Sequence, residues 1–264
     1  MPAVSTPTDD VIFREVIDPS DPILPSARNL YETVLDEAER IPWEWLERTP
    51  ERRRQWRPGQ RRSHLVVATP RVVEGQAIGF GYGAFIPNYG GYVCYLGVDP
   101  SMRSRGTGTK LFQFVFDLIA DAARTSSMPL PFVIWESHPS QYRDLWAARL
   151  RMFAKVGGLW ARGLEMLTPN YMRPDSPPVA LQIFVRPWDD SLDSFHSERI
   201  RQAVRGLYEN IYHIPPDDPL YETTMKTAVN PELVPAVNAL DDCARFGSIL
   251  TLPPALRGEG RVGG

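Results

Sequence analysis

Apolar positions along the chain follow two spacings, and each spacing predicts a different kind of element. Runs in which β-branched and aromatic residues alternate or cluster predict short strands, because successive strand side chains point to opposite faces. These runs are residues 11–16, 64–69, 76–86, 92–98, 129–136, 159–167 and 179–185. Runs with apolar residues three and four positions apart predict helices, because such residues share one helix face. The predicted helices begin near Ser26, after Ile41-Pro42, after Thr109 and at Gln141.

The C-terminal part of the chain, from residue 188 onward, reads as mainly helical. An apolar stripe covers 200–211 and ends at Ile214-Pro215-Pro216, and a shorter helix is predicted over 231–246. These stripes need burial, so the segment is expected to pack on the preceding domain or on another subunit, as in a homodimer. The expected division is a flexible N-terminus over 1–10, one domain over 11–187, a helical extension over 188–255 and a disordered tail over 256–264.

A strand end, a turn and a helix start follow one another in the middle of the chain. Residues 92–98 are apolar, Asp99-Pro100 ends the strand, and helical spacing begins beyond Thr109. The first turn of a helix leaves backbone N–H groups unpaired at the positive end of the helix dipole, which favours bound phosphate. The turn adds full positive charges at Arg103, Arg105 and Lys110. This stretch is therefore either an ordinary turn with a solvated basic face or a phosphate-binding loop.

The same stretch resembles the acyl-CoA-binding signature of the GNAT superfamily of N-acetyltransferases. That signature has a strand ending Leu-x-Val-x-Pro and then Gln/Arg-x-x-Gly-x-Gly/Ala. The chain matches it at these positions: Leu96, Val98, Pro100, Arg103, Gly106 and Gly108. A dinucleotide-binding loop would need glycine at Leu111, and a Walker loop would end Gly-Lys-Ser/Thr, so neither pattern fits.

The resemblance extends over roughly residues 11–187 and implies an α/β (α+β) fold. In the GNAT fold, a mixed and mostly antiparallel sheet has parallel fourth and fifth strands that splay apart. The thioester arm of acyl-CoA lies in that gap, which would place Leu96 and Val98 beside it. The resemblance assigns the phosphates of the cosubstrate to the loop that consists of Arg103, Ser104, Arg105, Gly106, Thr107, Gly108 and Thr109.

The composition of the chain limits the kinds of partner that we expect it to bind. The net charge is −3 and the pI is near 5.9, which argues against general nucleic-acid binding. No apolar run reaches the ~20 residues that span a bilayer, and the N-terminus has no signal core, so we expect a cytoplasmic protein that does not enter membranes. Two cysteines, Cys94 and Cys243, are too few for a zinc site, and no metal is expected.

An arginine-rich segment at residues 48–62 holds seven arginines. Such a run is usually a solvated helix face or loop. The functional alternative is a site for an acidic substrate group or an acidic partner, because arginine binds carboxylate and phosphate bidentately.

Acyl transfer to an amine needs a base that takes the amine's proton and an acid for the departing thiolate. Glu136, at the end of the fifth predicted strand, is the first candidate for the base, and His138 competes with it. Phe153 occupies the position where the family commonly has a tyrosine that acts as the general acid. Tyr142 or Tyr171 could replace it, solvent could protonate the thiolate, or the chain is not a catalyst.

These observations favour an acetyl-CoA-dependent N-acyltransferase that acetylates the amine of a small molecule or metabolite. One alternative is a non-catalytic acyl-CoA-binding module with a regulatory role. Another is a protein or tRNA acetyltransferase that docks its substrate on the arginine-rich segment.

Overall fold

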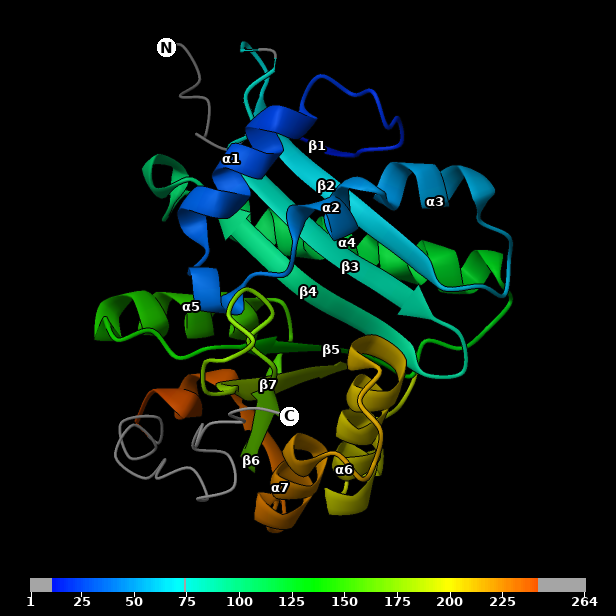
Figure 1. Ribbon diagram of the computed structural model, residues 1–264, viewed down its shortest axis with the longest axis vertical. Coiled ribbons are helices and arrows are strands. Elements are labelled where there is room, and N and C mark those ends of the chain that lie inside the picture. The colour runs from blue at the N-terminus through cyan, green and yellow to red at the C-terminus, as the bar shows by residue number, and fades with distance from the viewer. Residues whose placement is uncertain (1–10, 74, 242–264) are drawn as a thin grey trace, which may run out of the picture. The chain divides into compact units, whose positions relative to one another are not determined.

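The computed structural model describes residues 11–73 and 75–241, and these form two compact units (Figure 1). Unit 1 runs to Val133, apart from residues 38–40. Unit 2 consists of residues 38–40 and the chain from Ile134 onward. The expected flexible N-terminus, the disordered tail, residues 242–255 of the C-terminal extension and Cys243 lie outside the described residues.

Unit 1 contains an antiparallel sheet with the order β1-β2-β3-β4, in which each strand pairs with its neighbour in sequence. Its strands are β1 (Val11–Glu15), β2 (Arg62–Pro70), β3 (Gly79–Ile86) and β4 (Gly90–Val98). The β3–β4 register shifts by one residue at Cys94, because Tyr82 pairs with Tyr95 and Gly83 with Val93. This one-residue bulge bends β4 before its C-terminal half.

The helices of unit 1 cover both faces of this sheet (Figure 1). They are α1 (Leu24–Val34), α2 (Trp43–Glu47), α3 (Thr49–Gln55) and α4 (Thr107–Thr125), and a 3-10 turn, η2 (Pro100–Met102), precedes α4. The apolar stripe of α4 is buried against the sheet, on the face opposite α1. The amphipathic spacing predicted for this helix is confirmed.

Glycines on β3 make the close approach of α4 possible. A Cβ atom on Gly81 would lie 2.8 Å from Val115 Cγ2, and one on Gly83 would lie 2.9 Å from Val115 Cγ1. The alternating glycines of this strand, Gly79, Gly81 and Gly83, therefore face the central helix of unit 1.

Strand β5 (Phe132–Ser137) begins in unit 1 beside the start of β4. Tyr89, just before β4, and Phe132 have ring centroids 5.2 Å apart. Because both strands begin at this end of the sheet, β5 starts parallel to β4. The predicted α/β class with a mostly antiparallel sheet and a parallel fourth and fifth strand is confirmed. The splaying of the pair stays a prediction.

Unit 2 has its own antiparallel strands and helices. They are β6 (Leu159–Thr168), β7 (Val179–Pro187), β8 (Glu232–Pro235), α5 (Arg143–Lys155), α6 (Ser197–Leu207) and α7 (Pro219–Thr227). Strand β6 pairs with β7 on one side and β8 on the other. A π-helical turn, η4 (Tyr208–Tyr212), continues α6. None of the helices in the described part of the chain is long and apolar enough to cross a membrane.

The helix predicted over 231–246 is wrong for its first part, although residues 239–241 are helical. Residues 232–235 form β8, a 3-10 turn η5 (Ala236–Asn238) follows, and residues 242–246 lie outside the described residues. Prolines at 231 and 235 have no N–H for a helix, and Leu233 and Val234 pair instead with Ala161 and Trp160 of β6.

Candidate functional site

The predicted phosphate loop forms the start of α4, in unit 1. Gly106 is left-handed, with φ 80°, and Ser104 also has a positive φ of 62°. The helix begins at Thr107, and the N–H of Lys110 donates to the oxygen of Gly106 at 3.1 Å. The N–H groups of the three residues between these two precede the first helical hydrogen bond, so they can bind an anion.

The charges of the loop suit phosphate. Arg103, Arg105 and Lys110 are exposed, and neither Arg105 nor Lys110 forms an ion pair within the described ranges. Thr107 is buried, and its Oγ1 has no hydrogen-bond partner among the described residues. The loop thus offers backbone donors, a hydroxyl and fixed positive charge, which fits a pyrophosphate.

The C-terminal half of β4 has backbone groups that point away from β3. The N–H of Asp99 donates to the oxygen of Ile78 at 2.9 Å, so this N–H points toward β3. Backbone directions alternate along a strand, and the bulge at Cys94 lies before this segment. The N–H and C=O groups of Leu96 and Val98 therefore point away from β3. Both residues are half-buried. An extended pantetheine arm could pair with these groups as an added strand would.

Glu136 lies at the end of β5, in unit 2, and is half-buried. Its Oε1 accepts a hydrogen bond of 2.5 Å from the hydroxyl of Tyr212, which is 76 residues away in the sequence. The ring of Tyr212 stacks on Tyr171, with centroids 6.3 Å apart. The sequence pointed to Glu136 and Tyr171 but not to Tyr212. The C-terminal stripe showed a helix there, but nothing in it indicated which earlier residue the helix would contact.

The other predicted acid–base residues lie elsewhere in unit 2. Tyr142 directly precedes α5 and is 62% exposed. His138 is exposed and lies 3.8 Å from Glu39. Phe153 is buried, with its ring 4.7 Å from that of Phe184. An aromatic core therefore surrounds the position where the family commonly has a tyrosine, and the role of Tyr142 stays a prediction.

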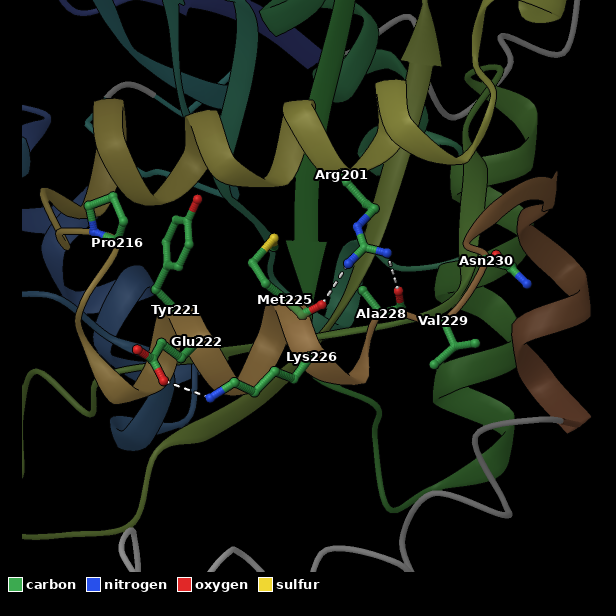
Figure 2. Close-up of a pocket in the computed structure, with 9 residues that line it drawn as sticks. All are labelled: Arg201, Pro216, Tyr221, Glu222, Met225, Lys226, Ala228, Val229 and Asn230. Atoms are coloured by element: carbon green, nitrogen blue, oxygen red, sulfur yellow. Dashed lines mark hydrogen bonds and ion pairs between the residues drawn. The ribbon is translucent and has the colours of Figure 1, made fainter.

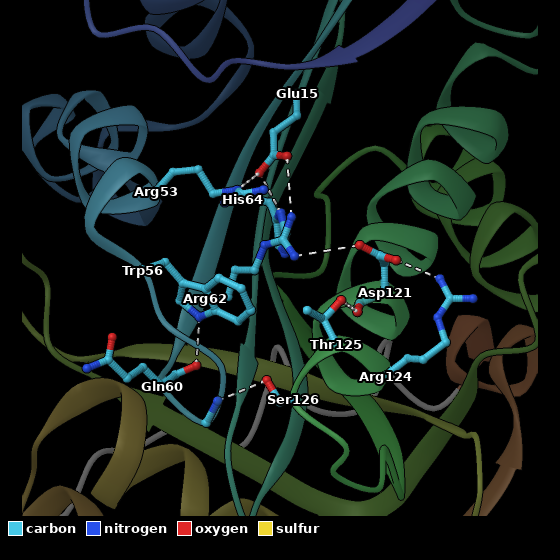
Figure 3. Close-up of polar contacts among 11 residues, drawn as sticks. Glu15, Arg53, Trp56, Gln60, Arg62, His64, Asp121, Arg124, Thr125 and Ser126 are labelled. Atoms are coloured by element: carbon cyan, nitrogen blue, oxygen red, sulfur yellow. Dashed lines mark hydrogen bonds and ion pairs between the residues drawn. The ribbon is translucent and has the colours of Figure 1, made fainter.

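Two members of the arginine-rich segment are held inside unit 1 (Figure 3). The guanidinium of Arg62 is buried over the ring of Trp56 at 4.9 Å, and lies 3.6 Å from Asp121 and 3.9 Å from Glu15. Burial lowers the pKa of Arg62. Arg53 lies 3.6 Å from the same Glu15. These two arginines tie the segment to β1 and α4, so they are structural.

A pocket of about 520 Å³ lies between α6 and α7 in unit 2 (Figure 2). Arg201 in its wall donates to the backbone oxygens of Met225 and Ala228, each at 2.9 Å. Lys226 pairs with Glu222 at 2.7 Å. The charged groups of this pocket thus bind within α7 or at its C-terminal end, and we assign the pocket no role in the reaction. No cluster of metal-ligating side chains occurs in the described ranges.

Residues 27–128 match the model of the acetyltransferase (GNAT) family. Over these residues the chain is similar to the GNAT acetyltransferases. The matched segment contains β2, β3, β4 and the whole of α4, so it includes the predicted loop for the CoA phosphates. The recognition made from the loop residues is confirmed.

A solved structure with a TM-score above 0.5 supports the GNAT fold, and two others have lower scores. A protein from Bacteroides thetaiotaomicron, described as an acetyltransferase from the GNAT family, superimposes with a TM-score of 0.52 at 14% identity, over 76% of this chain and 97% of that one. The NatC complex bound to Gag peptide and CoA gives 0.49 at 14% identity, over 68% and 99%. The ribosomal-protein-S18-alanine N-acetyltransferase from Escherichia coli gives 0.43 at 14% identity, over 67% and 93%. A comparison with curated protein sequences found no match.

Proposed function

We propose that this GNAT-family chain is an acetyl-CoA-dependent N-acyltransferase that acetylates a small-molecule amine. The observation that carries the proposal is the start of α4. A left-handed Gly106 directly precedes this helix, and the first N–H groups of the helix lie next to basic residues. Arg103, Ser104, Arg105 and the residues to Thr109 would hold the pyrophosphate. Leu96 and Val98 would hold the pantetheine arm through their backbone groups.

Acyl transfer to an amine requires one proton acceptor from the chain. The amine nitrogen forms a bond to the thioester carbonyl carbon, the carbon–sulfur bond breaks, and the proton of the amine must leave. We assign that proton to the carboxylate of Glu136. The N–H of Val98 would donate to the carbonyl oxygen as negative charge develops on it. We assign the proton that the thiolate takes up to Tyr142 or to solvent.

A small-molecule acceptor suits the charges better than an acidic polymer does. The net charge of −3 repels nucleic acid, and Arg53 and Arg62 are occupied by Glu15 and Asp121. The buried position of Phe153 favours one second function, a non-catalytic acyl-CoA-binding module. Such a protein would bind acetyl-CoA and release no thiol with any amine.

Calorimetric titration with acetyl-CoA tests the loop. Gly108→Glu places a carboxylate in the first turn of α4, where it repels phosphate, so we expect at least a tenfold loss of affinity, about 1.4 kcal/mol. Gly108→Ala is the matched control, because it fills the same position without charge, and it should bind more tightly than the Glu variant.

Equal affinities of the wild type and Gly108→Glu would refute the assignment of the loop. If the wild type binds, a library of amines with thiol detection separates the enzyme from the binding module. Thiol release with a small amine supports the first function, and binding without release with any amine supports the second.

A further inference from the structure

The C-terminal extension delivers a phenol hydroxyl to the carboxylate at the end of β5. Tyr212 closes the π-helical turn η4, and its hydroxyl donates to Oε1 of Glu136 at 2.5 Å. A phenol that donates to an ionised carboxylate makes a charge-assisted bond, which is stronger than a bond between neutral groups. π-helical turns are rare and often occur at functional sites.

The backbone on the N-terminal side of Tyr212 is firmly anchored. Tyr208, at the start of η4, is fully buried, and its hydroxyl donates to the oxygen of Leu167 at 2.7 Å. The N–H of Ile214 returns to the oxygen of Tyr208 at 3.0 Å and closes the turn. His213 ends the turn in a left-handed conformation, with φ 53°.

The ring of Tyr212 is also held by its neighbours. Tyr171, from the connection between β6 and β7, stacks on it with an interplanar angle of 13°. Stacked rings of this kind restrict side-chain rotation. The hydroxyl of Tyr212 is therefore fixed by its backbone and by its ring, and it holds Oε1 of Glu136 in one orientation.

We infer that Tyr212 is a positioning residue for Glu136: it keeps the carboxylate ionised and turns Oε2 toward the proton it accepts. This inference rests on the proposed acyl transfer, in which Glu136 accepts the proton of the amine. A hydrogen bond to the ionised form of a carboxyl lowers its pKa. Tyr212 donates throughout and does not touch the reacting atoms, so it adds no step to the reaction.

The test is the pH dependence of kcat/KM for Tyr212→Phe, which removes one oxygen atom and keeps the ring. Without the donor the carboxyl pKa rises, so the acidic limb of the profile should move up by about one pH unit, a tenfold loss below the limb. The KM for acetyl-CoA should stay unchanged. Tyr171→Phe is the matched control, because it removes the hydroxyl of the stacked ring, and its acidic limb should not move.

A second measurement is independent of turnover. The carboxyl carbon of Glu136, labelled with ¹³C and identified by its loss in Glu136→Gln, should titrate at higher pH in Tyr212→Phe than in the wild type. An unchanged titration, or equal shifts in Tyr212→Phe and Tyr171→Phe, would overturn the inference. A wild type that releases no thiol with any amine removes the proposed reaction, and with it a role in catalysis. The carbon titration then still decides whether Tyr212 controls the protonation of Glu136.

Discussion

His64 brings a titratable ring to a fully buried position on β2. Its Nδ1 lies 2.7 Å from Oε1 of Glu15. Burial lowers the pKa of His64, and although the hydrogen bond to Glu15 opposes this, burial outweighs it. Burial also works against ionisation of Glu15, but the hydrogen bond from His64 and the charges of Arg53 and Arg62 lower its pKa overall. The pair is therefore a neutral imidazole that donates to a carboxylate.

This pair predicts how stability depends on pH. The unfolded chain binds a proton at histidine below pH ~6.5, whereas folded His64 stays neutral, so folding loses stability as the pH falls through that value. The slope from one such group is at most about 1.4 kcal/mol per pH unit. Urea unfolding between pH 7.5 and 5.5 should show a flatter dependence in His64→Gln. His196 is exposed, so His196→Gln should keep the wild-type slope. Identical slopes in the wild type and His64→Gln would contradict this account.

Among single residues, the sequence was informative where chemistry and local pattern coincide. Gly106 and Arg103 belong to one continuous motif, and Glu136 follows a recognisable strand. Tyr212 belongs to a helical stripe in which any polar residue looks solvated. Its partner is 76 residues away, and no local spacing encodes such a contact.

At the scale of elements, α4 packs on a face of β3 where glycines stand in place of larger residues. Gly81 would meet only side-chain atoms if it carried a Cβ, at Val115 and Leu111. Gly83 would also meet the backbone oxygen of Tyr92 at 2.9 Å, which cannot rotate away. The two positions therefore differ in what could relieve an added methyl group.

This difference is testable by a double-mutant cycle. Gly81→Ala should destabilise the fold by about 1–3 kcal/mol through overpacking, and Val115→Ala in the same chain should recover part of that loss. Gly83→Ala should be recovered less by the same second change, because the clash with the backbone remains. Free energies of unfolding from urea titrations give both couplings, and equal recovery at both positions would refute the explanation.

The elements that were predicted correctly are determined by residues close together in the sequence, whereas the element that was missed depends on residues far away in the sequence. Strands β2 to β4 and helix α4 have clear periods and glycine or proline at their ends. The recurring apolar residues over 231–246 predict a helix, but Leu233 and Val234 pair with the edge of β6 as a strand. A short apolar run adopts the structure that its neighbour can pair with, and the neighbour is not local in sequence.

At the scale of the whole molecule, the C-terminal extension completes unit 2. Strand β8 pairs with residues 159–162 of β6. Further along β6, side chains bind the backbone of Leu167 in place of a neighbouring strand. Thr224 Oγ1 accepts from the N–H of Leu167 at 3.0 Å, and the hydroxyl of Tyr208 donates to the oxygen of Leu167. Thr224 and Tyr208 are fully buried.

Thr224→Val keeps the shape of the side chain and removes its hydrogen bonds with the N–H of Leu167 and with the hydroxyl of Tyr208. The buried N–H of Leu167 then loses its acceptor, and we expect unfolding to become easier by about 1–3 kcal/mol. Thr227 is exposed on the same helix and bonds only to the backbone of that helix, so Thr227→Val should change stability by about 0.5 kcal/mol or less. Thermal unfolding of the two variants measures the difference. A Thr224→Val variant as stable as Thr227→Val would contradict this role.

The hydroxyl groups at Leu167 also affect how copies of the protein meet in a crowded solution. An unpaired strand edge is a template on which another chain can add a strand, and repeated addition leads to aggregates. Strand β8 is only four residues long and ends in a proline, so it offers little template of its own. Beyond the end of β8, the side chains of Thr224 and Tyr208 bind the backbone of Leu167 at the edge of β6. Another strand cannot pair with these side chains as it would with a backbone. Resistance to self-assembly at this edge thus depends on two side-chain hydroxyls that lie 41 and 57 residues from Leu167 in the sequence.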